Sequence, residues 1–263
     1  MNQTSNSFPI SVPLAQRLRF VLVDTSHPGN VGATARAMKT MGFSELVLVN
    51  PRYPDVLSHE DAIAFASGAT DVLSTARIVS SLEDGLEGCN FCVALSARLR
   101  EFSPPRYEPR SLASHLQSTN GLRAAVVFGS ERYGLSNEQV EKCQAIVSVS
   151  TDADYGSLNL AQAVQIVAYE CRMAGLASHI ESGGLDQSSF TGDLATNEQI
   201  EGMFLHLEQA LIEIEFLDQD NPKKLMSRLR RLFARTSLET EEVNIFRGIA
   251  NQLLHHRKRR NKE

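Results

Sequence analysis

The feature that most restricts the fold of this chain is an alternation of short apolar runs with longer helical stretches. The apolar runs are nearly continuous in Val, Leu, Ile, Ala and Phe, which is typical of strands buried on both faces of a sheet. The helical stretches between them supply the covering layers. We therefore predict an α/β fold with a parallel sheet. The predicted strands are residues 19–23, 46–49, 77–79, 91–96, 124–128 and 145–149.

Composition and periodicity divide the chain into four segments. These are an N-terminal tail (1–16), an α/β body (17–177), a linker (178–196) and a small C-terminal all-helical domain (197–263). The tail has no Lys or Arg, and Pro9 and Pro13 interrupt it, so it does not resemble a signal peptide. The linker is rich in Gly and Ser. The helices predicted in the last segment cover 197–216, 222–235 and 239–256.

Charge is distributed unevenly along the chain. The net charge of −5 argues against a protein that binds nucleic acid over its whole surface. From Pro222 to the end, however, 12 Lys or Arg stand against 4 Asp or Glu. This part therefore carries +8, and the first 221 residues carry −13. An acidic body with a basic arm predicts a polyanionic partner for the helical domain.

The predicted helix over 222–235 carries a dense positive charge. It contains no Asp or Glu, whereas exposed helices usually mix both signs. The alternative is that these side chains form an ordinary solvated helix face. We favour contact with RNA, because a helix that carries only positive charge suits a row of phosphates. The candidate RNA ligands on this helix are Lys223, Lys224, Arg228, Arg230, Arg231 and Arg235.

Three loops containing Gly and Asn follow predicted strands, at the sheet edge where parallel α/β proteins bind ligands. The first runs from His27 to Arg36. Its glycines lack the spacing of a dinucleotide fingerprint, which disfavours a nucleotide cofactor there. Asn30 could be a helix cap. Arg36 lies in an Ala-rich turn and is either a paired structural charge or a ligand of phosphate.

The second and third loops carry further polar candidates. Glu131 lies between two glycines directly after a strand, where it could bind a ligand or simply be stabilised by a helix dipole. Ser157 could cap a long helix from about Leu158 to Leu176. Asn159 is a poor helix former just inside that helix, so a role in a site is reasonable. Because this helix is apolar on nearly every side, we expect it in the core or at a subunit interface.

Together the three loops match a known family. The first loop, with Asn30 and Arg36, is followed by F-G-x-E-x-x-G-L and then by S-L-N-L-A-x-A-V. This order resembles the three motifs of the SPOUT RNA methyltransferases. Within them, the chain is most similar to the bacterial tRNA (cytidine/uridine-2'-O-)-methyltransferases, which act at position 32 of the anticodon loop. The resemblance extends from Arg17 to about Leu253.

The resemblance implies a fold, a cofactor and partners. It implies a parallel α/β sheet with a C-terminal trefoil knot, S-adenosylmethionine as cofactor, tRNA as substrate, and a homodimer in which Arg36 of one subunit reaches the cofactor of the other. The matched catalytic residues are Asn30, Arg36, Glu131, Ser157 and Asn159. The matched cofactor-binding residues are Leu95, Ser96, Ala97, Gly129, Ser130, Glu131, Val149, Ser150, Ser157 and Leu158. Arg98 and Arg100 resemble ligands of RNA phosphates.

The implied reaction is an in-line displacement at the methyl carbon of the cofactor by a ribose 2'-hydroxyl. The leaving thioether is neutral, so no general acid is needed, and the protein must align the hydroxyl and manage its proton. The matched arginine is often assigned the role of base. Because a guanidinium stays protonated at neutral pH, we expect Arg36 instead to stabilise the developing alkoxide and hold the adjacent phosphate.

Other interpretations stay open at this point. The chain could methylate another RNA, could be a non-catalytic RNA-binding protein of the same fold, or could be a Rossmann-type oxidoreductase. Cys89 and Cys92 form a C-x-x-C with no second pair nearby, so we expect buried thiols and no metal. No apolar run approaches the roughly 20 residues of a membrane span. Four cysteines in a chain of this length suit a reducing cytoplasm.

Overall fold

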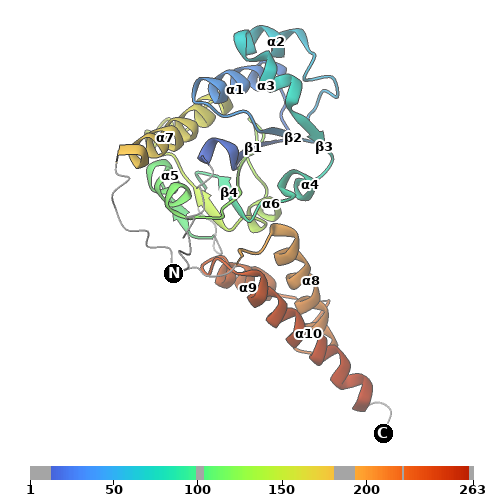
Figure 1. The fold of residues 1–263 in the computed structure, drawn as a ribbon. Coiled ribbons are helices and arrows are strands. Elements are labelled where there is room, and N and C mark those ends of the chain that lie inside the picture. Colours follow the sequence, from blue (N-terminus) through green and yellow to red (C-terminus); the bar gives the residue numbers. More distant parts are fainter. Residues whose placement is uncertain (1–12, 99–103, 181–192, 221, 261–263) are drawn as a thin grey trace, which may run out of the picture.

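The computed structural model describes residues 13–98, 104–180, 193–220 and 222–260 (Figure 1). Its centre is a sheet of seven parallel strands in the order β3-β2-β1-β6-β4-β7-β5, which confirms the predicted α/β class and the parallel sheet. Strand β5 pairs with β7 at the sheet edge and was not predicted, because two residues give no periodic signal. The strands are β1 (Leu18–Val23), β2 (Leu46–Val49), β3 (Arg77–Val79), β4 (Phe91–Leu95), β5 (Arg106–Tyr107), β6 (Ala124–Phe128) and β7 (Ala145–Val147).

Helices cover both faces of the sheet, as the near-continuous apolar strands predicted. Alternate residues of β1 enter two different cores: Leu18 and Phe20 pack into the larger one, and Val21 packs into the smaller one. The larger core lies under α1 (Pro28–Thr40), α2 (Glu60–Ala66), α3 (Thr70–Thr75), α5 (Pro109–Ser118) and α7 (Leu160–Ile180). The smaller core lies under α4 (Leu82–Leu86) and α6 (Asn137–Glu141), and Figure 1 shows α4 apart from α1 and α7.

Helix α1 begins at Pro28 and is capped by His27. The His27 Nδ1 accepts from the backbone N–H of Gly29 at 3.1 Å, so Asn30 is not the cap. The helix ends at Thr40, and the chain turns away at Gly42, which adopts a φ of +85° that suits a residue without Cβ. Gly32 lets α2 approach closely: a Cβ at Gly32 would lie 2.1 Å from the backbone oxygen of Ala62.

Helix α7 is apolar on two sides, but only one of these sides is buried in a single chain. Val164, Val167 and Ala168 are fully buried against the sheet. Tyr169, Met173 and Leu176 are 42–47% exposed and form a stripe at helical spacing on the other side. One chain thus places one side of this helix in the core, and burial of the other side at a subunit interface stays a prediction.

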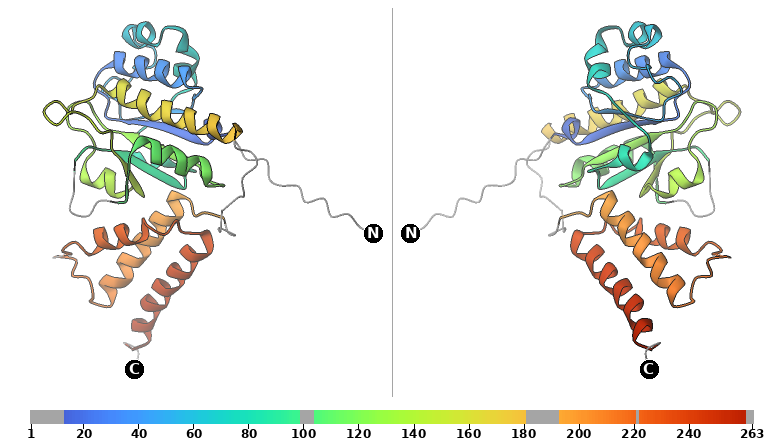
Figure 2. Two further views of the ribbon diagram at one scale, coloured as in Figure 1. Left: turned by 90° about the vertical axis from the view of Figure 1, so that its left-hand side faces the viewer. Right: turned by 90° about the vertical axis from the view of Figure 1, so that its right-hand side faces the viewer.

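The C-terminal helices form their own small core beneath the sheet (Figures 1 and 2). The helices are α8 (Asn197–Glu213), α9 (Leu225–Phe233) and α10 (Thr240–Arg260). Phe204 of α8 and Phe233 of α9 meet in this core with ring centroids 5.8 Å apart. The start of α8 is attached to the α/β body, since the Asn197 N–H donates to the Cys89 carbonyl at 2.8 Å.

The segment boundaries differ from the prediction at two places. Leu14–Gln16 form a short 3-10 helix, and Leu14 is only 5% exposed in the larger core, so the predicted tail is ordered near its end. At the end of the predicted linker, Ala195 is buried and Thr196 caps α8. Residues 1–12 and 181–192 lie outside the described part of the chain.

Candidate cofactor and RNA site

A cavity of about 260 Å³ opens at the carboxyl ends of β4, β6 and β7. Three loops form its walls: the segment after β4, the segment after β6, and the segment between β7 and α7. Leu95, Phe128, Leu158, Leu160 and Ala163 give it an apolar floor. Parallel α/β sheets bind ligands at this edge. The second and third loops identified from the sequence line the cavity together with the segment after β4, whereas no residue of the first loop lines it.

Nearly all of the predicted cofactor-binding residues line this cavity. Those that line it are Leu95, Ser96, Ala97, Gly129, Ser130, Glu131, Val149, Ser157 and Leu158. Ser150 is the exception, because it is exposed and does not line the cavity. Gly129 allows the loop after β6 to fold back closely on itself, because a Cβ at this position would lie 2.2 Å from the backbone carbon of Gly134.

Glu131 ties the loop after β6 to the loop after β1. Its Oε2 accepts from the backbone N–H of Ser26 at 3.0 Å and from the Ser26 hydroxyl at 2.7 Å. Its Oε1 accepts from Asn30 Nδ2 at 2.7 Å. Ser26 was missed from the sequence, although its position just after a strand, in the same loop as Asn30, was an available signal.

These hydrogen bonds stabilise the ionised form of the Glu131 side chain. Burial by itself raises the pKa of Glu131, but the hydrogen bonds from Asn30 and from Ser26 outweigh it, and the pKa lies below the ordinary value. A negative charge therefore stays on the cavity wall at neutral pH. Such a charge suits a ligand that carries a positive group.

Asn159 links the third loop to the same network. Its Nδ2 donates to Asn30 Oδ1 at 2.9 Å, so Asn30 connects Glu131 with Asn159. Asn159 is also the cap of α7: its Oδ1 accepts from the Ala161 N–H at 2.9 Å. The prediction that Ser157 caps this helix was therefore wrong, and Asn159 is exposed and lies before the helix rather than inside it.

Arg36 lies apart from this network. It is exposed on α1 and does not line the cavity. Among the residues that the structure describes, none forms an ion pair with its guanidinium. One chain thus brings Asn30, Glu131, Ser157 and Asn159 together and leaves Arg36 outside.

Arginines gather at the mouth of the cavity. Arg98 is exposed and lines both the cavity and an adjoining groove. Arg52 and Arg132 line the same groove and were not selected as ligands from the sequence. Arg100 lies outside the described residues.

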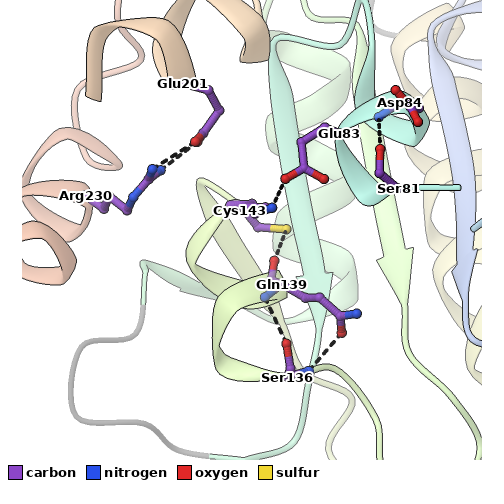
Figure 3. A network of polar contacts seen from close by, with 9 residues as sticks. Ser81, Glu83, Asp84, Ser136, Gln139, Cys143, Glu201 and Arg230 are labelled. Atoms are coloured by element: carbon purple, nitrogen blue, oxygen red, sulfur yellow. Dashed lines mark hydrogen bonds and ion pairs between the residues drawn. The ribbon is translucent and has the colours of Figure 1, made fainter. Parts of the chain in front are cut away.

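Arg230 of the predicted basic helix has a structural partner. Its guanidinium makes two hydrogen bonds to the Glu201 carboxylate, at 2.6 and 2.8 Å, and lies 4.4 Å from the centroid of the Phe204 ring (Figure 3). Both side chains of the pair are about one-fifth exposed. The sequence could not show this pairing, because the acidic partner comes from another helix. Lys223, Lys224, Arg228 and Arg235 are exposed, and Arg231 is half-buried.

The cysteines are buried thiols, as expected. All four are free and buried. Burial raises the pKa of Cys89 to about 11, and the pKa values of Cys92 and Cys143 are also raised by burial. The described residues contain no group of His, Cys, Asp and Glu arranged to hold a metal ion. No helix in the described ranges is long and apolar enough to cross a membrane.

Two family models match this chain. The SpoU rRNA Methylase family matches residues 17–169, and the tRNA methyltransferase TrmJ C-terminal domain matches residues 198–263. The first model covers the sheet and its loops, and the second covers the small helical core. The chain therefore belongs to the SpoU methylase family, and it is a methyltransferase of the class that uses S-adenosylmethionine.

Particular relatives resemble the chain over most of its length. The tRNA (cytidine/uridine/adenosine-2'-O-)-methyltransferase TrmJ of Pseudomonas aeruginosa is 46% identical over 247 residues, which cover 91% of this chain and 94% of that protein. The tRNA (cytidine/uridine-2'-O-)-methyltransferase TrmJ of Salmonella choleraesuis is 44% identical, with 90% and 96% covered. The crystal structure of TrmJ from Z. mobilis has a TM-score of 0.75 at 30% identity, with 92% and 99% covered.

Proposed function

We propose that this protein transfers the methyl group of S-adenosylmethionine to the ribose 2'-hydroxyl of a cytidine or uridine at position 32 of the tRNA anticodon loop, in the cytoplasm. The observation that carries the proposal is the hydrogen-bonded network of Asn30, Glu131 and Asn159 beside a cavity at the sheet edge. The relatives at 44–46% identity are tRNA 2'-O-methyltransferases, and this likeness supports the reaction and the substrate class.

The cavity has the chemistry that this cofactor requires. The apolar side chains of Leu95, Leu158 and Leu160 suit an adenine ring, and the loop backbones around Gly129 offer hydrogen-bonding groups. The ionised Glu131 suits a cationic ligand. When bound, S-adenosylmethionine supplies an electrophilic methyl group with a neutral leaving group. The residues Leu95, Ser96, Ala97, Gly129, Ser130, Val149, Ser157 and Leu158 would hold it.

The protein then has to orient the ribose and manage one proton. Because the leaving group would be neutral, the one proton that the protein has to manage is that of the 2'-hydroxyl, which would be released to solvent. The Asn30–Glu131–Asn159 network fixes the loop after β6 and the segment before α7 against the start of α1, so that the hydroxyl can be aligned with the methyl carbon. Arg36 stabilises the negative charge that develops on the oxygen and remains protonated throughout.

The exposed position of Arg36 supports a homodimer in which this residue completes the site of the other subunit. In one chain Arg36 is outside the cavity and without an ion-pair partner among the described residues. The exposed stripe of Tyr169, Met173 and Leu176 on α7 would be covered in such a dimer. Placing Arg36 in the partner's site accounts for both observations.

The helical domain is proposed to bind the body of the tRNA. Its exposed Lys223, Lys224, Arg228 and Arg235, together with the half-buried Arg231, place positive charge along one segment of the surface. Arg230 is excluded from this set because Glu201 already binds its guanidinium.

We also propose that the α/β body is knotted. The strand order places β4 between β6 and β7, so successive segments of the C-terminal part of the sheet return past one another. The three cavity loops come from these returns. A knot would fix the loops by topology as well as by hydrogen bonds.

The test is methyl transfer from labelled S-adenosylmethionine to full-length tRNA transcripts, with the product nucleotide mapped. We expect a 2'-O-methyl group at position 32 and no labelling of a transcript whose position 32 is a 2'-deoxynucleotide. A product at position 34 would retain the reaction and overturn the position. Cofactor binding without any tRNA product would overturn the substrate, and the same assay on ribosomal RNA would then identify the alternative.

A further inference from the structure

An open groove of about 1080 Å³ adjoins the cofactor cavity. The loop after β6 lines both, through Arg132 and Tyr133 among others. The groove is also lined by Asp24, which follows β1, and by Arg52, which follows β2. The groove therefore lies along the same edge of the sheet as the Glu131 network. An extended ligand that enters the cavity would continue into it.

The groove carries excess positive charge. Arg52, Arg98 and Arg132 all line it and are exposed. None of the three forms an ion pair with a residue in the described ranges. Asp24 supplies the opposing charge, and its Oδ1 already accepts from Asn50 Nδ2 at 2.8 Å. The arginine heads are thus available to a negatively charged ligand.

Tyr133 presents an aromatic ring in this groove. Its backbone belongs to a tight loop: the Gly134 N–H donates to the Ser130 carbonyl at 2.9 Å, and the Tyr133 N–H donates to Ser130 Oγ at 3.2 Å. The side chain is nevertheless 65% exposed, and the Arg132 guanidinium lies 5.1 Å from the ring centroid. A large exposed aromatic ring on a hydrogen-bonded loop suits a flat partner.

We propose that this groove binds the nucleotide next to the methylated one, with its base stacked on Tyr133 and its phosphates on Arg52 and Arg132. The proposal rests on the RNA methyltransferase function proposed above and deepens it. Single-stranded nucleic acid is recognised by this combination of a positively charged groove and an exposed aromatic side chain. Arginine beside the ring adds a cation–π contact, and the loop that holds Tyr133 also holds Glu131, so binding in the groove positions the target.

The first test measures tRNA affinity in the presence of S-adenosylmethionine, by fluorescence anisotropy with labelled tRNA. Tyr133→Ala is expected to weaken binding about 5- to 100-fold, which is the range for loss of one stacked base. Tyr133→Phe retains the ring and is expected to bind within twofold of the wild type. The control is Phe216→Ala, since Phe216 is 67% exposed but lies among acidic residues after α8.

The second test identifies the stacked base. An anticodon stem-loop is prepared with one abasic nucleotide at each loop position in turn. The wild-type protein is expected to lose affinity strongly at a position adjacent to the target, and Tyr133→Ala is expected to show no further loss at that position. Equal losses for both proteins at every position would overturn the stacking role. So would tRNA affinity of Tyr133→Ala within twofold of the wild type.

The third test concerns the phosphates. Arg52→Gln is expected to make the plot of log affinity against log salt shallower by about 0.7, the slope for one phosphate of a single strand. Arg77→Gln is the matched control, because Arg77 is exposed on edge strand β3 and does not line the groove. An unchanged slope for Arg52→Gln would remove Arg52 from the groove's ligands. All three tests measure binding, so they remain informative if no methyl transfer is found.

Discussion

The side-chain amide of Asn30 donates a 2.7 Å hydrogen bond to the carboxylate of Glu131, which lies 101 residues further along the chain. The other end of the same amide accepts from Asn159, 129 residues away. One side chain therefore joins the start of α1, the loop after β6 and the segment between β7 and α7. This arrangement explains why a neutral amide at position 30 suits the site better than a charged residue.

Replacement of Asn30 by Ala is expected to lower the free energy of unfolding by about 1–3 kcal/mol, because a carboxylate loses a hydrogen-bond donor. Asn159→Ala is expected to be coupled to it. In a double-mutant cycle measured by urea unfolding, we expect an interaction free energy of about 0.5 kcal/mol or more, because Asn30 and Asn159 share a hydrogen bond. Additive effects would show that the three loops are fixed independently.

Glu131 is expected to make stability depend on acid pH. Its pKa is lowered in the folded protein, so its contribution is present above its unfolded pKa, near 4.5, and is lost as pH falls through the lower folded value. Glu131→Gln removes this contribution. The difference in Tm between wild type and Glu131→Gln, measured by calorimetry, should be largest near pH 7 and shrink below about pH 4. A constant difference down to pH 2.5 would contradict the lowered pKa.

Gly129→Ala is expected to weaken cofactor binding strongly. Its Cβ would meet the backbone of Gly134 and Leu135 at 2.2–2.4 Å, so the loop after β6 must move. Isothermal titration with S-adenosylmethionine should show at least a tenfold loss of affinity. Gly68→Ala is the control, because nothing lies within 4 Å of its Cβ. Unchanged binding by Gly129→Ala would show that the loop adjusts freely.

Substitutions of Arg230 and of Lys223 are expected to have different effects, the first on the stability of the protein and the second on its binding of RNA. Arg230→Gln breaks a pair with Glu201 and should lower the free energy of unfolding by about 1–3 kcal/mol. Lys223→Gln, at an exposed site, should leave unfolding unchanged and weaken tRNA binding, with the dependence on salt shallower by about 0.9. Thermal unfolding and tRNA titrations at several salt concentrations measure the two effects. A stability loss for Lys223→Gln alone would reverse these assignments.

A shared active site can be tested by subunit complementation. Arg36→Ala and Gly129→Ala are each expected to be inactive. In a co-expressed mixture, half of the dimers are mixed, and each mixed dimer holds one site with a normal cavity and a normal Arg36. About one quarter of the wild-type activity should return if Arg36 acts across a two-fold interface. No recovery, with mixed dimers verified by tag purification, would place Arg36 in its own subunit's site.

The sequence predicted the sheet, its parallel direction and the cavity loops because these depend on local patterns. Apolar runs identify buried strands, and Gly and Asn after a strand identify the edge that binds ligands. It could not predict contacts that depend on distant partners. The pairing of Arg230 with Glu201 is such a contact, because it joins two different helices. The cap of α7 is local, and it was assigned to Ser157 instead of Asn159 because the helix begins at Leu160 and not at about Leu158. The exposed stripe on α7 is a second example of a feature that the sequence alone could not predict. The sequence showed that the helix is apolar on nearly every side, but it did not show which side packs against the sheet.

The long sequence separations within the Asn30 network have a consequence for synthesis of the protein. During synthesis Asn30 leaves the ribosome first. Glu131 and Asn159 follow only after a further 101 and 129 residues have been added. Closing such long loops is slow compared with forming a helix, and it must wait until β7 and the start of α7 have left the exit tunnel. The nascent enzyme therefore cannot capture its methyl donor until the last element of the α/β body has docked.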